Sequence, residues 1–178
     1  MKPKLSLVIF AAAAILVAAA FSGSHLLTAR AAQHSSGFLL LPPAAPAGQQ
    51  VLYGHIKSLG TKGGHLELRF DPAFLLSGLT ATRAKLEDTG SGEVPNDTYT
   101  RDESHKLLTY LMSPTARVTV LTNQGTKGIS STVIPVSELV RIVQGKPNHH
   151  KLYEPLDSGI WIRVRIDTVR EVDQQYKP

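Results

Sequence analysis

The chain has 178 residues, with 19 Lys and Arg against 14 Asp and Glu, and it contains no cysteine. The lack of cysteine excludes disulfides, thiolate nucleophiles and cysteine-based zinc sites, so packing has to hold the folded part together. Lys2, Lys4 and Arg30 precede the expected mature chain, which leaves 16 basic and 14 acidic residues and a net charge of +2. This small excess, without a Lys/Arg block, argues against nucleic-acid binding.

Residues 1–31 carry the pattern of an export signal. Two lysines precede an acid-free apolar run at 5–21, and Ala29-Arg30-Ala31 forms a small-residue cleavage triplet. We expect residues 1–31 to be a signal peptide or, if they are not cleaved, an N-terminal anchor that spans the membrane through residues 5–21. The protein is then exported, and it is either secreted or associated with the cell envelope.

Residues 32–50 are rich in Pro and Ala and carry no Lys, Arg, Asp or Glu, which is typical of an extended linker. The apolar run at 38–41 has two interpretations: it docks on the folded domain, or it contacts a membrane surface. Residues 51–178 follow, and this length is normal for a single globular domain with one core.

Alternating apolar and polar residues predict strands. The clearest is GIWIRVRID, in which Ile160, Ile162, Val164 and Ile166 share one face. Further strands are expected at 51–59, 65–71, 106–112 and 116–122. The glycine-rich segment LGTKGGH is expected to turn the first of these back on the second as a β-hairpin.

Short helices are expected between the strands. Asp71 and Pro72 form a cap and first turn for one helix ending at Gly78, and a second runs from Thr80 to Gly90. A third is expected within VSELVRIVQGKP. The chain is therefore predicted to be α+β, with an antiparallel β-sheet that is curled or forms a small open barrel, and with two or three short helices. An oligonucleotide/oligosaccharide-type barrel is one option within this class.

The outer face of the clearest strand carries Trp161, Arg163 and Arg165 in a row. An exposed indole beside two guanidinium groups could stack on a sugar or bind a carboxylate or phosphate. The alternative is that both Arg stems shield Trp161 through a cation–π contact, without any ligand.

The segment EVPNDTYTRDESHK concentrates polar side chains. In an extended chain Glu103 and His105 share a face, so that they could supply two of the three protein ligands of a catalytic zinc, with Asp97 as a further candidate. We favour instead a polar edge strand that follows a turn at Pro95, Asn96 and Asp97. No cofactor is expected.

Three weaker candidates are interpreted structurally. His149 and His150 lie in a loop bounded by Pro and Gly and are expected to be solvated. Ser91 lacks the G-x-S-x-G elbow that a hydrolase nucleophile needs. Asp71 is better explained as a helix cap than as a general acid or base.

The motifs YGHIKSL, RFDPAF, VPNDTYTRDE and RIDTVREVDQQY, in this order from Tyr53 to the C-terminus, resemble those of small exported bacterial proteins of uncharacterised function. The resemblance implies export and a single domain, and it implies no activity. Such proteins commonly have an Asp-Gly turn late in the chain. Here Thr168 follows Asp167, which argues against a tight two-residue hairpin at that point.

Three functions follow from these patterns. The first is a non-catalytic extracytoplasmic binding module for a cell-envelope component or a protein partner, acting through Trp161, Arg163 and Arg165. The second is a metal-assisted extracytoplasmic hydrolase that uses Glu103, His105 and Asp97. The third is a structural subunit of an exported complex.

Overall fold

The structure is a computed structural model that describes residues 44–102 and 106–177. The predicted signal peptide, the apolar run at 5–21 and most of the predicted linker lie outside the described residues, as do Glu103 and His105. Within the described ranges, no helix is long and apolar enough to cross a membrane.

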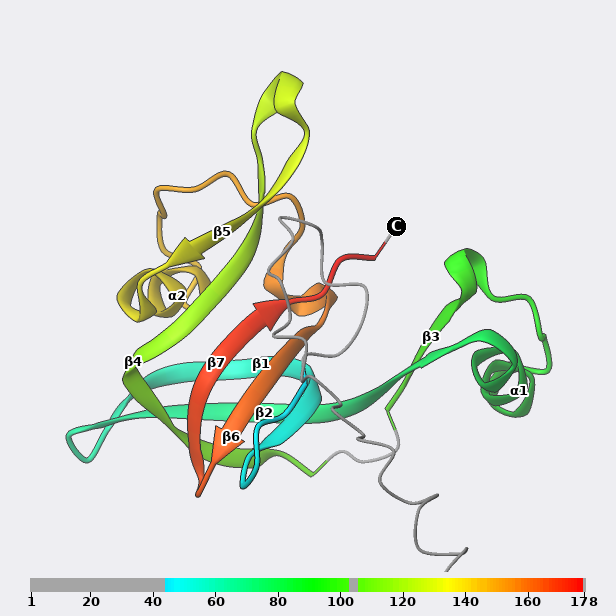
Figure 1. The fold of residues 1–178 in the computed structure, drawn as a ribbon, viewed down its shortest axis with the longest axis horizontal. Helices are drawn as coiled ribbons and strands as arrows, with labels where there is room; N and C mark the ends of the chain where they lie inside the picture. The colour runs from blue at the N-terminus through cyan, green and yellow to red at the C-terminus, as the bar shows by residue number, and fades with distance from the viewer. Residues whose placement is uncertain (1–43, 103–105, 178) are drawn as a thin grey trace, which may run out of the picture. The chain divides into compact units, whose positions relative to one another are not determined.

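Five strands close into a barrel (Figure 1). They are β1 (Gln50–Lys62), β2 (His65–Ser77), β4 (Leu108–Asn123), β6 (Ile160–Arg165) and β7 (Thr168–Gln174). β1 pairs with β2 and β6, β7 lies between β6 and β4, and β4 pairs with β2 to complete the circle. The prediction of a small α+β barrel is confirmed, but the barrel is closed rather than open.

The sheet is mixed, because β4 and β7 run parallel. The prediction of an antiparallel sheet is wrong at this pair. Parallel neighbours need a long connection, and here the segment between β4 and β6 supplies it. That segment contains β5 (Ile129–Ile134) and α2 (Val136–Val143), and the tight β6–β7 hairpin then reverses the chain beside β4.

Two elements form an arm beside the barrel. The end of β2 pairs with β3 (Thr98–Arg101), and α1 (Gly78–Thr89) connects these two strands and packs against them. α2, in contrast, contacts β1 and β4 of the barrel itself. The described residues thus contain two α-helices, within the predicted two or three, together with three single turns of 3₁₀-helix.

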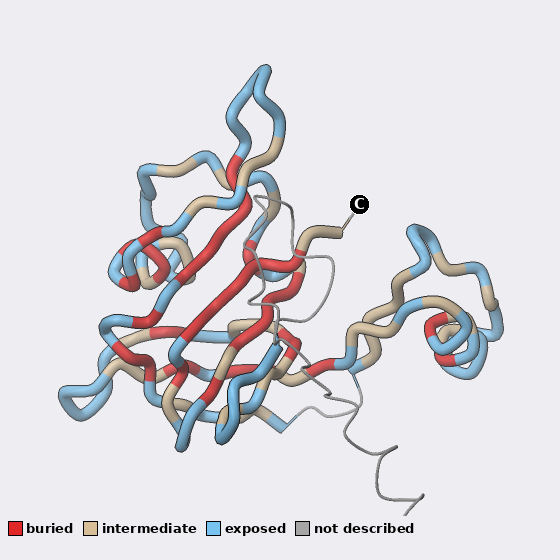
Figure 2. Tube along the Cα trace, viewed as in Figure 1, coloured by how far each residue is buried: buried red, intermediate tan, exposed pale blue. Residues whose placement is uncertain are grey.

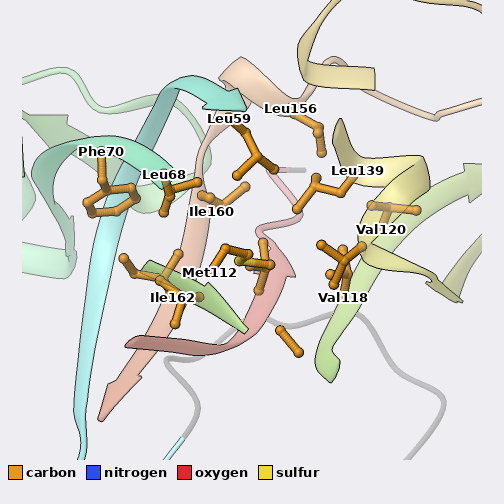
Figure 3. Close-up of a cluster of buried hydrophobic side chains, with 14 of the residues drawn as sticks. Leu59, Leu68, Phe70, Met112, Val118, Val120, Leu139, Leu156, Ile160 and Ile162 are labelled. Atoms are coloured by element: carbon orange, nitrogen blue, oxygen red, sulfur yellow. The ribbon is translucent and has the colours of Figure 1, made fainter. Parts of the chain in front are cut away.

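The core fills the barrel with side chains from its strands and from α2. Leu68, Phe70, Ile160 and Ile162 are fully buried, as alternation predicts. Figure 3 shows these side chains converging with Leu139, which α2 contributes. Buried positions are concentrated along β4, β6 and β7 (Figure 2).

The predicted helix from Asp71 to Gly78 is wrong, because β2 continues through this segment to Ser77. Asp71 is buried and its carboxylate lies 2.8 Å from the Lys57 ammonium, so it does not cap a helix. Pro72 lies opposite Gly54 on β1. Helix α1 begins only at Gly78, and it ends, as predicted, at Gly90, which has a left-handed conformation with φ of 75°.

The strands predicted at 106–112 and 116–122 are parts of one long strand, β4. Its register against β7 shifts between Met112 and Arg117, around Pro114. Proline cannot donate to a ladder and is tolerated at such irregularities.

Both hairpin turns have two residues. The predicted β1–β2 hairpin is confirmed, with Gly63 and Gly64 at positive φ. The β6–β7 hairpin also forms, although a tight turn was not expected there. Ile166 and Asp167, with φ of 45° and 56°, form this turn, and Thr168 lies after it.

Candidate functional site

Trp161 is not the exposed aromatic that the sequence predicts. It is 8% exposed, and its Nε1–H donates to Oε1 of Gln175 at 2.6 Å. Its ring centroid lies 4.9 Å from that of Tyr53, with Ala73 in the same small cluster. The expectation fails because β6 lies between β1 and β7, so neighbouring strands and the chain after β7 enclose the outward-facing indole.

Arg163 and Arg165 also differ from the predicted row. Arg163 forms an ion pair with Glu171 on β7, which also accepts a hydrogen bond from Arg117 on β4 at 3.0 Å. Its guanidinium is therefore neutralised within the sheet. Arg165 is exposed at the end of β6 and has no such partner among the described residues. The three predicted residues do not share an accessible surface.

The same outer face of the sheet holds Asp173, opposite Trp161 on β6 and Thr119 on β4. Burial raises the pKa of the Asp173 carboxyl, and the nearby Glu171 carboxylate raises it further. Glu171 is neutralised by Arg163 and Arg117, and burial favours the uncharged form of Asp173, which together favour a structural role for this face.

The alternative metal site is tested only in part. Asp97 is exposed in the predicted turn, which is confirmed, and β3 follows it as a polar edge strand. Glu103 and His105 lie outside the described residues. No group of three or more His, Asp or Glu side chains suited to a metal occurs within 44–102 and 106–177.

His149 is exposed to solvent, as predicted, and it also contacts Glu138 on α2. Its backbone N–H donates to Oε1 of Glu138 at 2.6 Å, and its ring Nδ1 lies 3.2 Å from Oε2. The pKa of the Glu138 carboxyl is lowered, chiefly by the backbone hydrogen bond from His149. Ser91 is exposed in the loop after α1.

A cleft in the arm has a volume of about 460 Å³ and lies between α1 and the β2–β3 pair. Arg101 on its wall lies 2.9 Å from a carboxylate oxygen of Asp88 and 3.3 Å from one of Glu87. The pKa of Glu87 is lowered, first by the hydrogen bond from Arg83, then by the Arg83 charge and then by the Arg101 charge. These cations are already paired with acids of the arm, so the cleft offers little to a charged ligand.

The larger hollow, with a volume of about 700 Å³, is termed the barrel groove. It lies where the β1–β2 turn, the bend of β4, the start of α2 and the start of β7 meet. Its lining residues are Thr61, Gly64, His65, Leu66, Leu111, Met112, Ser113, Pro114, Pro135, Val136, Ser137, Val140, Thr168 and Arg170.

Arg170 reaches the barrel groove because it is the extra residue of a β-bulge. Val169 pairs with Val164 and Glu171 pairs with Arg163, so Arg170 has no partner in the ladder with β6. A bulge re-aims the side chain that it carries. It lets Val169 face the core while Glu171 pairs across the outer face, and it leaves Arg170 exposed at the barrel groove.

The barrel groove is electropositive. Its charged or titratable side chains are Arg170 and His65, and none of its described lining residues is acidic. Arg170 forms no ion pair with any residue in the described ranges, and its one hydrogen bond there, to Ser113 Oγ, is long at 3.5 Å. The first amides of α2, at Val136 and Ser137, add the positive end of a helix. The groove is also lined by the hydroxyl-bearing residues Thr61, Ser113, Ser137 and Thr168. Together these groups suit a carboxylate or a phosphate.

The sequence reasoning missed Arg170 because it did not predict β7. A signal was available: TVREV follows the strand ending at Arg165 after only two residues, Ile166 and Asp167, and a tight turn there would return it along β6. The bulge obscured the strand, because the apolar residues Val169 and Val172 are three apart instead of two.

Comparison with known proteins adds no assignment. No protein-family model matches the chain. No curated protein and no solved structure matches it either.

Proposed function

We propose that this protein is a non-catalytic binding module of the cell envelope, exported by its N-terminal segment, and that its barrel groove binds an anionic group of an envelope component. The observation that carries the proposal is Arg170, a cation without an ion-pair partner in the described ranges, at a hollow whose described lining has no acid. An unpaired guanidinium suits a planar carboxylate or a phosphate from outside.

We further propose that the barrel is of the oligonucleotide/oligosaccharide-binding type. The support is its strand order: in chain order its five strands run first, second, third, fifth, fourth around the circle, and the third and fifth are parallel. Barrels of this type bind ligands near the first turn, the last turn and the second and third strands. The barrel groove involves the β1–β2 turn, β4 and the start of β7, which is the corresponding region.

The lining indicates the ligand's character. Leu66, Met112, Val136 and Val140 form an apolar part, and hydroxyls lie beside Arg170. A volume of about 700 Å³ is within the usual range for small-molecule sites. No Phe, Tyr or Trp side chain lines the groove among the described residues, so we expect charge and apolar contact to contribute more to binding than stacking on such a ring. An acidic group attached to an aliphatic or sugar moiety fits this arrangement.

Titration with glycerol 1-phosphate and with acetate, followed by NMR, tests the proposal. The amides of residues at the barrel groove should shift, and Arg170→Gln should weaken binding about tenfold or more, because a charge-assisted hydrogen bond contributes about 1.5–3 kcal/mol. Arg69→Gln is the matched control. Arg69 is an exposed strand arginine outside the groove, and its loss should leave the affinity unchanged.

Two results would contradict the proposal. One is equal weakening by both substitutions, which would indicate nonspecific attraction to the surface. The other is the absence of amide shifts at the barrel groove at millimolar concentrations of both anions. Export is tested separately by fractionation of cells: the protein should be found in the envelope or the medium, and replacement of residues 1–31 by Met should retain it in the cytoplasm.

A further inference from the structure

The turn between β6 and β7 carries an unusual residue. Ile166 is 85% exposed and has φ of 45°. Left-handed backbone is disfavoured for β-branched residues, and two-residue hairpins of this kind normally use Asn, Asp or Gly there. An exposed isoleucine in this conformation gains nothing from the core, which points to a contact with something outside the chain.

A second exposed aliphatic side chain lies beside this turn. Leu111 on β4 is 45% exposed, and its N–H donates to the carbonyl oxygen of Asp167 at 2.9 Å. Leu111 also lines the barrel groove together with Thr168. Ile166 and Leu111 together form the apolar tip. Since Leu111 also lines the barrel groove, the apolar tip is continuous with the edge of the groove at which Arg170 lies.

Positive charge flanks the apolar tip. Arg165 precedes Ile166 and Arg170 follows it at the bulge; both are exposed, and neither forms an ion pair within the described ranges. Asp167 is the acid of the turn itself, and Glu67, opposite Leu111 on β2, is paired with Lys62, so the charged groups around Ile166 and Leu111 sum to one positive charge. Apolar side chains that project between arginines are complementary to the surface of an anionic bilayer, with acyl chains below and phosphates above.

We propose that Ile166 and Leu111 insert into the outer layer of an anionic bilayer while Arg170 and Arg165 contact the headgroup phosphates. This inference rests on the proposed function, because it identifies the anionic envelope component as a membrane lipid and the barrel groove as the place where its headgroup is held. The strained tip is then the part of the protein that enters the lipid.

The experiment must separate this contact from membrane binding by the N-terminal segment. Since the chain has no cysteine, Ile166→Cys gives the full-length protein a single labelling position. An environment-sensitive fluorophore there is measured with vesicles of phosphatidylglycerol and phosphatidylcholine, and with vesicles of phosphatidylcholine alone. Val133→Cys is the matched control, because Val133 is also a β-branched, exposed residue, at 60%, on the edge strand β5.

The label at 166 should shift to shorter wavelength with phosphatidylglycerol vesicles and be quenched by lipids that carry a nitroxide in the acyl chain. The label at 133 should do neither. Arg170→Gln in the Ile166→Cys protein should require about fivefold more lipid for half of the shift. An unshifted label at 166 on vesicles that retain the protein would overturn the inference, as would identical responses at 166 and 133 or no effect of Arg170→Gln.

These outcomes are distinguishable from failure of the proposed function. If glycerol 1-phosphate shifts the amides of the barrel groove while the label at 166 stays in water, the groove binds anions but the lipid inference is wrong. If the label enters the acyl layer while no soluble anion binds, the proposed soluble-anion site is wrong and the tip contact stands.

Discussion

The most direct test of the packing concerns Trp161, the only tryptophan in the chain. Its indole is 8% exposed, packs at a tilt against the Tyr53 ring and donates a 2.6 Å hydrogen bond to Gln175. Trp161→Ala leaves a cavity and should lower the free energy of unfolding by about 3–5 kcal/mol. Trp161→Phe keeps an aromatic ring but removes the N–H donor and part of the volume, which should cost about 1–2 kcal/mol.

Urea unfolding followed by circular dichroism measures both changes. In the unmutated protein, fluorescence of Trp161 should be blue-shifted and nearly insensitive to iodide, and it should move to the red on unfolding. Arg165→Ala is the control, because this exposed side chain should change stability by no more than about 0.5 kcal/mol. Strong iodide quenching in the folded protein, or a loss of less than about 1 kcal/mol in the free energy of unfolding of Trp161→Ala, would refute the burial of Trp161. The exposed row of Trp161, Arg163 and Arg165 would then again be a candidate binding surface.

Three further changes test the fold. Ile166→Asn should raise the free energy of unfolding by about 1 kcal/mol in urea melts, because Asn tolerates the positive φ; a loss of stability would show that the turn is not strained. Gly54→Ala should destabilise by about 3 kcal/mol or more, since a Cβ there would overlap the Asp71 carbonyl oxygen, and a near-neutral result would contradict the close approach of β1 and β2. Hydrogen bonds from His149 lower the pKa of Glu138, so the ionised Glu138 stabilises the fold above pH 4.5, and this stabilisation is lost as the pH falls through the lowered pKa. Glu138→Gln should therefore flatten the dependence of the free energy of unfolding on pH below pH 4.5. If the free energies of unfolding of Glu138→Gln and of the unmutated protein change in parallel with pH, the pairing with His149 is refuted.

Periodicity predicted the parts of the fold that have one buried face and a regular ladder. The β1–β2 hairpin, the inward residues of β6 and the end of α1 at Gly90 follow from alternation and turn chemistry alone. The helix at Asp71-Pro72 failed because the local signal for a cap was overridden by pairing with β1. A short segment has no information about a partner strand that lies elsewhere in the chain.

The candidate site was less predictable, because exposure depends on what covers a strand. Alternation correctly places Trp161 on the opposite face of β6 from Ile160 and Ile162. It does not predict that neighbouring strands and Gln175 also cover this outer face. Arg163 appeared free for the same reason: its acidic partner, Glu171, lies on β7, a strand that was not predicted.

The failure to predict β7 and the accessibility of Arg170 have one physical cause. A regular strand would repeat its inward positions every two residues, whereas β7 buries Val169 and Val172, three positions apart. Arg170, the extra residue of the bulge, shifts the alternation so that both Val169 and Val172 face the core, and its own side chain is left outside the ladder with β6. A charged residue is well suited to that position, since it needs solvent or a ligand rather than the core. Deletion of Arg170 should therefore disturb the whole strand, whereas Arg170→Gln should change only the barrel groove.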